Sequence, residues 1–95
     1  MKSICKYPLN PNMFELCLPE GSRLLSVQAQ NGKPQIWVMV DSDPGALNSE
    51  VHDIRIIGTG ADATEVADPA SWNFLGTFQL NDGRLVFHVF HRRKP

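Results

Sequence analysis

The sequence predicts a mainly β domain, either a small antiparallel β-sandwich or a partly closed barrel of about seven strands. Three observations favour this fold. Apolar residues recur at every second position in most segments, which is the spacing of a half-buried strand. Turn-forming residues separate these segments at fairly regular intervals. No stretch shows the apolar spacing of an amphipathic helix.

The first half of the chain contains four segments with this alternation. They are residues 3–7, 13–18, 24–30 and 35–40. The first two end at proline-containing turns, which interrupt strand pairing. The last two flank Asn31-Gly32, whose residues both accept positive φ angles, so a hairpin is expected here. Its predicted core-facing residues are Leu25, Val27, Ala29, Ile36, Val38 and Val40.

The second half predicts three further strands and two loops. The strand segments are residues 53–57, 74–80 and 84–90, and the loops are residues 42–50 and 61–72. Asn81-Asp82-Gly83 lies between the last two strand segments and predicts a second hairpin. Leu85, Phe87 and Val89 are expected to face the core. Loop 61–72 is expected to contain at most one helical turn, because Asp68-Pro69 interrupts it.

Length and composition indicate one domain, residues 1–95, with a basic C-terminal tail at 91–95. The chain is 42% hydrophobic and has a formal net charge of −1, which argues against a strongly acidic DNA mimic. The N-terminus lacks the apolar core of a signal peptide, so we expect a cytoplasmic protein with no membrane association. Cys5 and Cys17 are expected to be reduced, because a secreted disulfide scaffold of this size would normally contain more cysteines.

Several predicted strands are apolar on both faces. The apolar residues expected on their outward faces are Trp37, Met39, Val86 and Phe90. Either a second copy of the chain covers them, which would make the protein a homo-oligomer, or loop 61–72 does so.

Catalytic and metal sites are not indicated by the residue pattern. His88 and His91 are three apart on a predicted strand and point to opposite faces, and the cysteines lack the spacing of a zinc site. His88 is expected beside Phe90, and His91 in solvent near the tail. No nucleophile motif supports a hydrolytic triad, so we expect a protein that is not an enzyme and has no cofactor.

The clearest candidate ligand-binding segment is Gly58-Thr59-Gly60, which follows a predicted strand. A loop of this kind leaves backbone N–H groups and a hydroxyl accessible to a phosphate, although it could equally be a flexible strand end. Arg55 is the nearby base, and it could instead hold the acidic loops together. Additional candidates are the stacking aromatics Trp37 and Trp72 and the tail bases Arg92 and Arg93, which could also simply be solvated.

Blocks of residues along nearly the whole chain resemble a known family. The blocks are Lys6-Tyr7-Pro8-Leu9, Pro19-Glu20-Gly21, Leu25-Ser26-Val27-Gln28, Gln30-Asn31-Gly32-Lys33-Pro34, Trp37, Asp41, Gly58-Thr59-Gly60, Leu75-Gly76-Thr77-Phe78-Gln79 and Leu85-Val86-Phe87-His88-Val89-Phe90. This set resembles a family of small proteins encoded by bacteriophages and prophages, most of them without assigned function. The resemblance implies a viral accessory protein in the cytoplasm of the host bacterium, and it transfers no site residues.

The resemblance and the absence of a catalytic motif together favour a binding protein that counters a host defence. The first expectation for such a protein is that it sequesters a cyclic nucleotide signal, which needs phosphate contacts and stacking aromatics. It could instead occlude a host defence protein, as an anti-CRISPR protein does, or have a minor structural or regulatory role. Nucleic acid is an improbable partner, because no strand interleaves aromatic and basic residues.

Overall fold

The computed structural model describes residues 1–41 and 48–95, so most of the expected loop 42–50 lies outside the described residues, and its last two residues, Ser49 and Glu50, are in a strand instead of a loop. The elements follow in the order β1 (Lys2–Pro8), β2 (Glu15–Pro19), β3 (Arg23–Gln30), β4 (Lys33–Asp41), β5 (Ser49–Gly58), the 3-10 turn η1 (Thr64–Val66), β6 (Asn73–Leu80) and β7 (Leu85–Arg93). Seven strands and one helical turn confirm the predicted mainly β fold.

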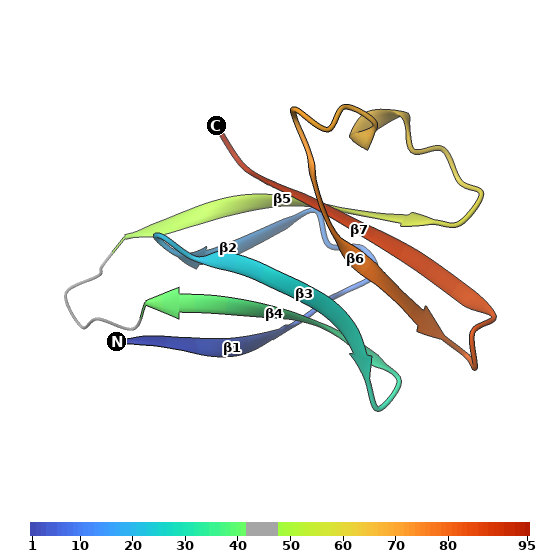
Figure 1. The fold of residues 1–95 in the computed structure, drawn as a ribbon, viewed down its shortest axis with the longest axis horizontal. Helices are drawn as coiled ribbons and strands as arrows, with labels where there is room; N and C mark the ends of the chain where they lie inside the picture. The colour runs from blue at the N-terminus through green and yellow to red at the C-terminus, as the bar shows by residue number, and fades with distance from the viewer. Residues whose placement is uncertain (42–47) are drawn as a thin grey trace.

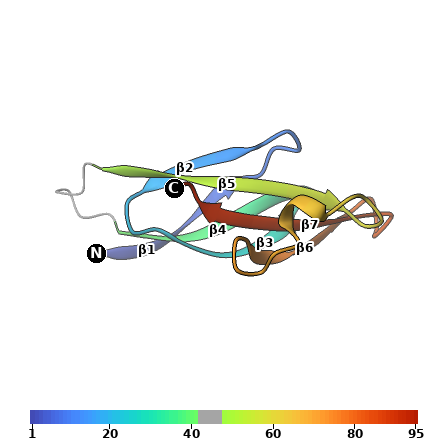
Figure 2. The same cartoon turned by 90° about the horizontal axis from the view of Figure 1, so that it is seen from above.

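The strands form two antiparallel sheets, one with the order β1-β4-β3 and the other with the order β2-β5-β7-β6. The sheets face each other as two layers (Figures 1 and 2). Within the described residues they are not closed into a barrel. The sandwich is therefore the better of the two predicted architectures.

Both predicted hairpins are present. Asn31-Gly32 joins β3 to β4 with φ angles of 53° and 75°, and Asn81-Asp82-Gly83 joins β6 to β7 with φ angles of 53°, 55° and 85°. Every one of these residues adopts positive φ, which Gly, Asn and Asp tolerate better than other residues. Local turn chemistry thus sets the position of each hairpin.

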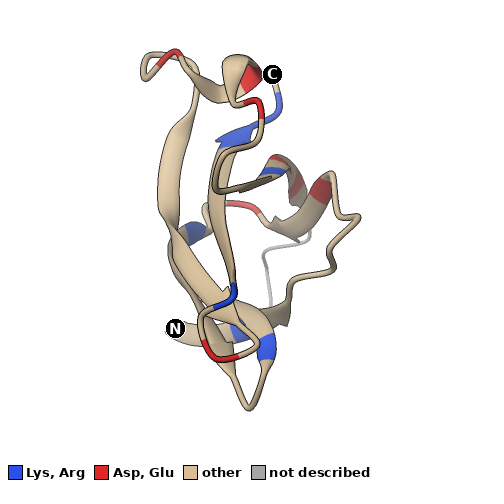
Figure 3. Ribbon diagram, turned by 90° about the vertical axis from the view of Figure 1, so that its right-hand side faces the viewer, with Lys and Arg blue, Asp and Glu red and all other residues tan. Residues whose placement is uncertain are grey.

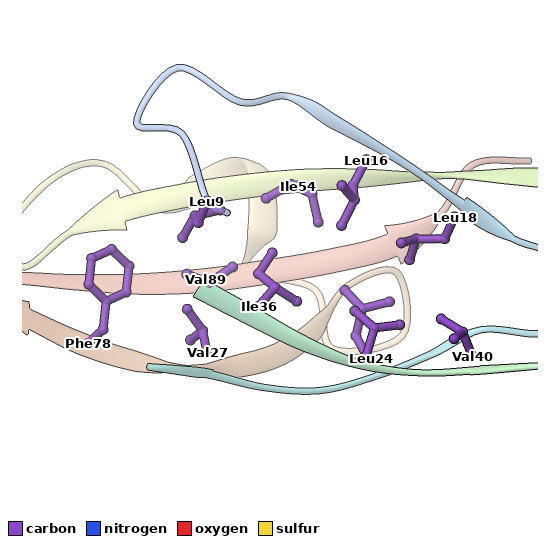
Figure 4. Close-up of a cluster of buried hydrophobic side chains, with 11 residues drawn as sticks. Leu9, Leu16, Leu18, Leu24, Val27, Ile36, Val40, Ile54, Phe78 and Val89 are labelled. Atoms are coloured by element: carbon purple, nitrogen blue, oxygen red, sulfur yellow. The ribbon is translucent and has the colours of Figure 1, made fainter. Parts of the chain in front are cut away.

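The core lies between the two sheets. Figure 4 shows Ile36 of β4, Ile54 of β5 and Val89 of β7 converging there, and all three are fully buried. The other members of the buried cluster are Leu9, Leu16, Leu18, Leu24, Val27, Val38, Val40 and Phe78. The alternating residues of β4, β5 and β7 therefore supply the centre of the core, as the period of two predicts.

Three predicted core positions are wrong, those of Leu25, Ala29 and Leu85, and Ala29 is exposed. The pairing of β3 with β4 shifts register between Leu24 and Ser26, so Leu24 takes the core position expected for Leu25. A β-bulge of this kind reverses which side chains face inward from that point on. Leu85 was also expected in the core, but it lies beside the hairpin tip and is 43% exposed.

The edges of the two sheets approach each other closely at β3 and β6. A Cβ atom built on Gly76 would lie 3.1 Å from Cγ1 of Val27. The pairing of β6 with β7 also shifts register between Phe74 and Gly76. A Cβ atom at position 76 would require Val27 to move, so Gly76 is a packing glycine.

Three residues of the expected basic tail belong to a strand. Strand β7 continues through Arg93, and the Lys94 N–H donates to the Val51 carbonyl at 2.8 Å. Figure 3 shows basic and acidic residues interspersed along the ribbon. The C-terminal bases are thus parts of the sheet and not a free cationic arm.

Candidate functional site

The candidate site lies on the outer face of the β2-β5-β7-β6 sheet. Strand β5 pairs with β7 in a register that sets Asp53 opposite Arg92 and Arg55 opposite Phe90. These side chains point away from the core, because Ile54 and Val89 on the same strands point into it. Trp72 and Val66 are buried without belonging to the core cluster, so the segment between β5 and β6 forms a second packed region.

Two guanidinium groups lie against the ring of Trp72. The Cζ atom of Arg92 is 4.2 Å from the centroid of the indole ring, and that of Arg55 is 5.2 Å from it. The Cζ atom of Arg55 also lies 4.3 Å from the centroid of the Phe14 ring. We call Phe14, Arg55, Trp72 and Arg92 the arginine–aromatic cluster. Cation–π contacts of this kind are stronger where water is excluded, and Trp72 is only 5% exposed.

The charges of this cluster are balanced by carboxylates of the same chain. Nε of Arg55 donates to Oε1 of Glu65 at 2.9 Å, and Nε of Arg92 donates to Oδ2 of Asp53 at 2.9 Å. Nη1 of Arg55 donates to the carbonyls of Phe14 and Ile54 at 3.2 and 3.0 Å. Two cations therefore meet two anions, and a phosphate at Arg55 would have to displace Glu65.

Two large phenylalanines on this face are exposed, Phe14 within the cluster and Phe74 outside it. Phe14 is 63% exposed and Phe74 is 59% exposed. Phe74 is the cross-strand partner of Phe90, and the two ring centroids are 5.3 Å apart. The outer face thus presents exposed aromatic rings around partly exposed, charge-balanced arginines.

A pocket of about 220 Å³ lies on the same face beside Gly58-Thr59-Gly60. It is lined by Ile57, Gly58, Thr59, Gly60, Ala61, Ala63, His88 and Phe90. The two alanines of this lining belong to the segment between β5 and β6, so part of that segment lies next to Phe90. Covering of Phe90 by loop 61–72 was the predicted alternative to covering by a second copy of the chain. Arg55 does not line this pocket, although it belongs to the same strand.

His88 provides the polar wall of this pocket. Its Nε2 is 2.7 Å from Oγ1 of Thr59 and its Nδ1 is 2.9 Å from Oγ1 of Thr77, so both ring nitrogens have hydroxyl partners. The Thr59 N–H donates to the Val86 carbonyl and the Ala61 N–H to the Gly58 carbonyl, at 3.1 and 3.0 Å. The Thr59 N–H, one of the backbone donors expected to receive a phosphate, is therefore used inside the chain.

The remaining candidate residues lie elsewhere. Trp37 pairs with Lys6 on the other sheet, and Nζ of Lys6 is 5.8 Å from the centroid of its ring. Nε of Arg93 lies 2.7 Å from Oε2 of Glu50. The structure thus brings together Arg55, Trp72 and Arg92, places Gly58–Gly60 further along the same face, and separates Trp37 and Arg93 from them.

Sequence reasoning missed Phe14, Asp53, Glu65 and Phe74 as members of this face. Asp53 and Arg92 are 39 positions apart, and the β5–β7 register alone makes them neighbours. The one available signal was the alternation along residues 53–57, which places Asp53 and Arg55 on one face.

A pair of histidines, the buried His52 and the partly buried His91, lies at the opposite, inner face of the same strands. The ring centroids of His52 and His91 are 6.4 Å apart, and Nε2 of His52 is 3.7 Å from Oε1 of Glu50. Both ring nitrogens of His52 and Nδ1 of His91 are buried without a hydrogen-bond partner. Burial, reinforced by the neighbouring His52, lowers the pKa of His91 to about 4. The expected solvent-exposed position of His91 is therefore wrong, because β7 continues through it.

The described residues contain neither a candidate metal site nor a helix that could cross a membrane. Residues 1–41 and 48–95 contain no group of three or more His, Cys, Asp or Glu side chains placed to hold a metal ion. None of their helices is long and apolar enough to cross a membrane. Both cysteines are free, with Cys17 exposed and Cys5 partly buried.

Comparison with known proteins identifies a family without identifying an activity. Searches of curated proteins and of solved structures returned no match. A domain of unknown function, DUF7352, matches residues 1–95, which is the whole chain. The chain therefore belongs to the DUF7352 family.

Proposed function

We propose that this protein is a non-enzymatic binding protein that occludes a partner protein with the outer face of the β2-β5-β7-β6 sheet. The observation that carries the proposal is the exposure of two aromatic rings, Phe14 within the arginine–aromatic cluster and Phe74 opposite Phe90 on the neighbouring strand. Aromatic residues and arginine are enriched in protein interfaces and dominate their binding energy. A rigid, preorganised cluster also loses little conformational entropy on binding.

The resemblance to phage-encoded proteins suggests the biological setting of this proposal. The partner would be a host defence protein, and the site of action the cytoplasm of the host bacterium. Occlusion ranks above sequestration of a nucleotide because Glu65 and Asp53 already neutralise Arg55 and Arg92. A phosphate binds best where a cation lacks such a partner.

Site-specific photo-crosslinking in bacterial cells tests the proposal. A photoreactive phenylalanine analogue at position 14 or 74 should crosslink to a discrete host protein. The same analogue at Gln28, an exposed position of β3 on the other sheet, is the control and should not. Crosslinks that form only between copies of this chain would overturn occlusion and would instead support the homo-oligomer that the sequence offers as one way to cover its outward-facing apolar residues.

Sequestration of a cyclic nucleotide is the second candidate, and the pocket beside Gly58–Gly60 favours it. This pocket offers a hydroxyl, an imidazole and the ring of Phe90 for stacking. Calorimetry against a panel of cyclic di- and trinucleotides tests it directly. Binding should weaken in His88→Ala and should fall as salt rises, because phosphate contacts are screened. A panel without any binding member eliminates this candidate.

A further inference from the structure

The free edge of the β1-β4-β3 sheet provides a different surface from the one proposed above. Strand β1 is the outermost strand of this sheet, and within the described residues β4 is its one pairing partner (Figure 1). At the other edge, β3 runs against β6, where Val27 meets Gly76. An unpaired strand edge presents N–H and C=O groups that can receive a further strand.

The register shows which backbone groups of β1 point away from the sheet. Pro8 pairs with Gln35, and the next N–H, that of Leu9, donates to the Pro34 carbonyl at 3.0 Å. Hydrogen-bonded positions alternate along an antiparallel ladder, so the odd-numbered residues of β1 bond to β4. The backbone groups of Lys2, Ile4 and Lys6 therefore point to the free edge. Pro8 has no N–H and ends this row of donors.

The side chains at the same positions define what the edge can recognise. Lys2, Ile4 and Lys6 are exposed on the outer face, and Ile4 is 59% exposed. Strand β1 contains these two lysines and no acidic residue. Opposite charges directly across two strands stabilise their pairing, and like charges destabilise it.

We infer that the β1 edge binds an extended segment of a partner protein in which acidic residues flank an apolar residue at alternate positions. The two acids would face Lys2 and Lys6, and the apolar residue would face Ile4. Backbone hydrogen bonds to the free edge would supply affinity, and the charge pattern would supply selectivity. A second copy centred on Ile4 would set Lys2 of one chain against Lys6 of the other, which like-charge repulsion disfavours.

A synthetic peptide tests this inference independently of any natural partner. The peptide Thr-Glu-Thr-Val-Thr-Glu-Thr reads the same in both directions, so it suits a parallel or an antiparallel added strand. Titration followed by NMR should shift the amide signals of β1, and the lysine analogue Thr-Lys-Thr-Val-Thr-Lys-Thr should bind about tenfold more weakly. The double variant Lys2→Glu/Lys6→Glu should reverse this preference.

A backbone variant tests the hydrogen bonds separately. Ile4→Pro removes one outward N–H without removing a bond to β4, and it should abolish peptide binding, whereas Ile4→Val should keep it. If Ile4→Pro fails to fold, the charge-reversed variant still decides. Equal binding of both peptides, unaffected by charge reversal, would overturn the inference. So would sedimentation that shows a dimer abolished by Ile4→Pro, because the edge would then belong to a second copy.

Discussion

The guanidinium group of Arg92 covers the indole ring of Trp72, with its Cζ atom 4.2 Å from the ring centroid, while its Nε donates to the buried Asp53. One arginine thus joins the segment between β5 and β6 to the sheet beneath it. The contact also explains how a tryptophan outside the main core becomes buried. Four predictions follow from this and related contacts.

The Trp72→Ala variant should be much less stable than the parent protein. Trp72 is 5% exposed, and truncation of a buried large aromatic residue costs about 3–5 kcal/mol. Trp72→Phe should recover part of this loss, because a smaller ring still stacks on Arg92. Urea unfolding followed by circular dichroism measures both. Trp37→Ala is the matched control, because the Trp37 ring on the other sheet is only partly buried. A loss of stability in Trp37→Ala as large as that in Trp72→Ala would contradict the special role of Trp72.

Arg55→Ala should destabilise the protein more than Glu65→Gln does. The Arg55 side chain is 15% exposed and meets two rings and two carbonyls, whereas Glu65 is 57% exposed, so solvent screens their ion pair. We expect a loss of about 2 kcal/mol for Arg55→Ala and about 0.5 kcal/mol for Glu65→Gln. A double-mutant cycle by urea unfolding separates the pair energy from the rest. Equal losses for the two variants would mean that the ion pair dominates.

Unfolding stability should decrease as the pH falls from about 6.5 to about 4. The pKa of His91 is about 4 in the folded protein and 6.5 in the unfolded chain, so the unfolded chain binds the proton first. The contribution of neutral His91 to the free energy of unfolding is therefore fully present above about pH 6.5, and it is lost as the pH falls toward 4 and the unfolded chain binds the proton. The charged neighbours on the inner face are Glu50 and Arg93, together with the titratable His52.

The variant His91→Gln should flatten this pH dependence. Urea midpoints measured between pH 4 and pH 7 compare it with the parent protein. His88→Gln serves as the control, because His88 lies on the outer face with hydroxyl partners on both ring nitrogens. An unchanged slope in His91→Gln would show that other groups cause the dependence.

Gly76→Ala should destabilise the contact between β3 and β6. The added Cβ atom would lie 3.1 Å from Cγ1 of Val27, and overpacking of this kind costs about 1–3 kcal/mol. Adding Val27→Ala should restore space, so the double variant should be more stable than the sum of the single changes predicts. Thermal unfolding measures the coupling. Gly58→Ala is the control, since its Cβ would meet Phe87 at an ordinary 3.8 Å.

The candidate site was only partly accessible to sequence reasoning. Arg55, Trp72 and Arg92 were each recognisable as residues able to stack or bind anions, and they do converge. Their role differs from the expectation, because Glu65 and Asp53 occupy their charged groups. No local sequence pattern predicts a contact between residues 39 positions apart, such as Asp53 and Arg92. The neutralisation of Arg92 could therefore not be deduced without the register of β5 with β7.

Local chemistry along the chain was sufficient for the number of strands among the described residues, for both hairpins and for the helical turn, but not for the start of β5 at Ser49 or the end of β7 at Arg93. Alternation sets which residues of β4 and β7 face the core, and positive φ angles confine the tight turns to Asn, Asp and Gly. The bulge after Leu24, the free edge of β1 and the stacking on Trp72 depended on the tertiary structure. Each arises from the pairing of distant segments, and the energy of such pairing depends on partners that no short window of sequence contains.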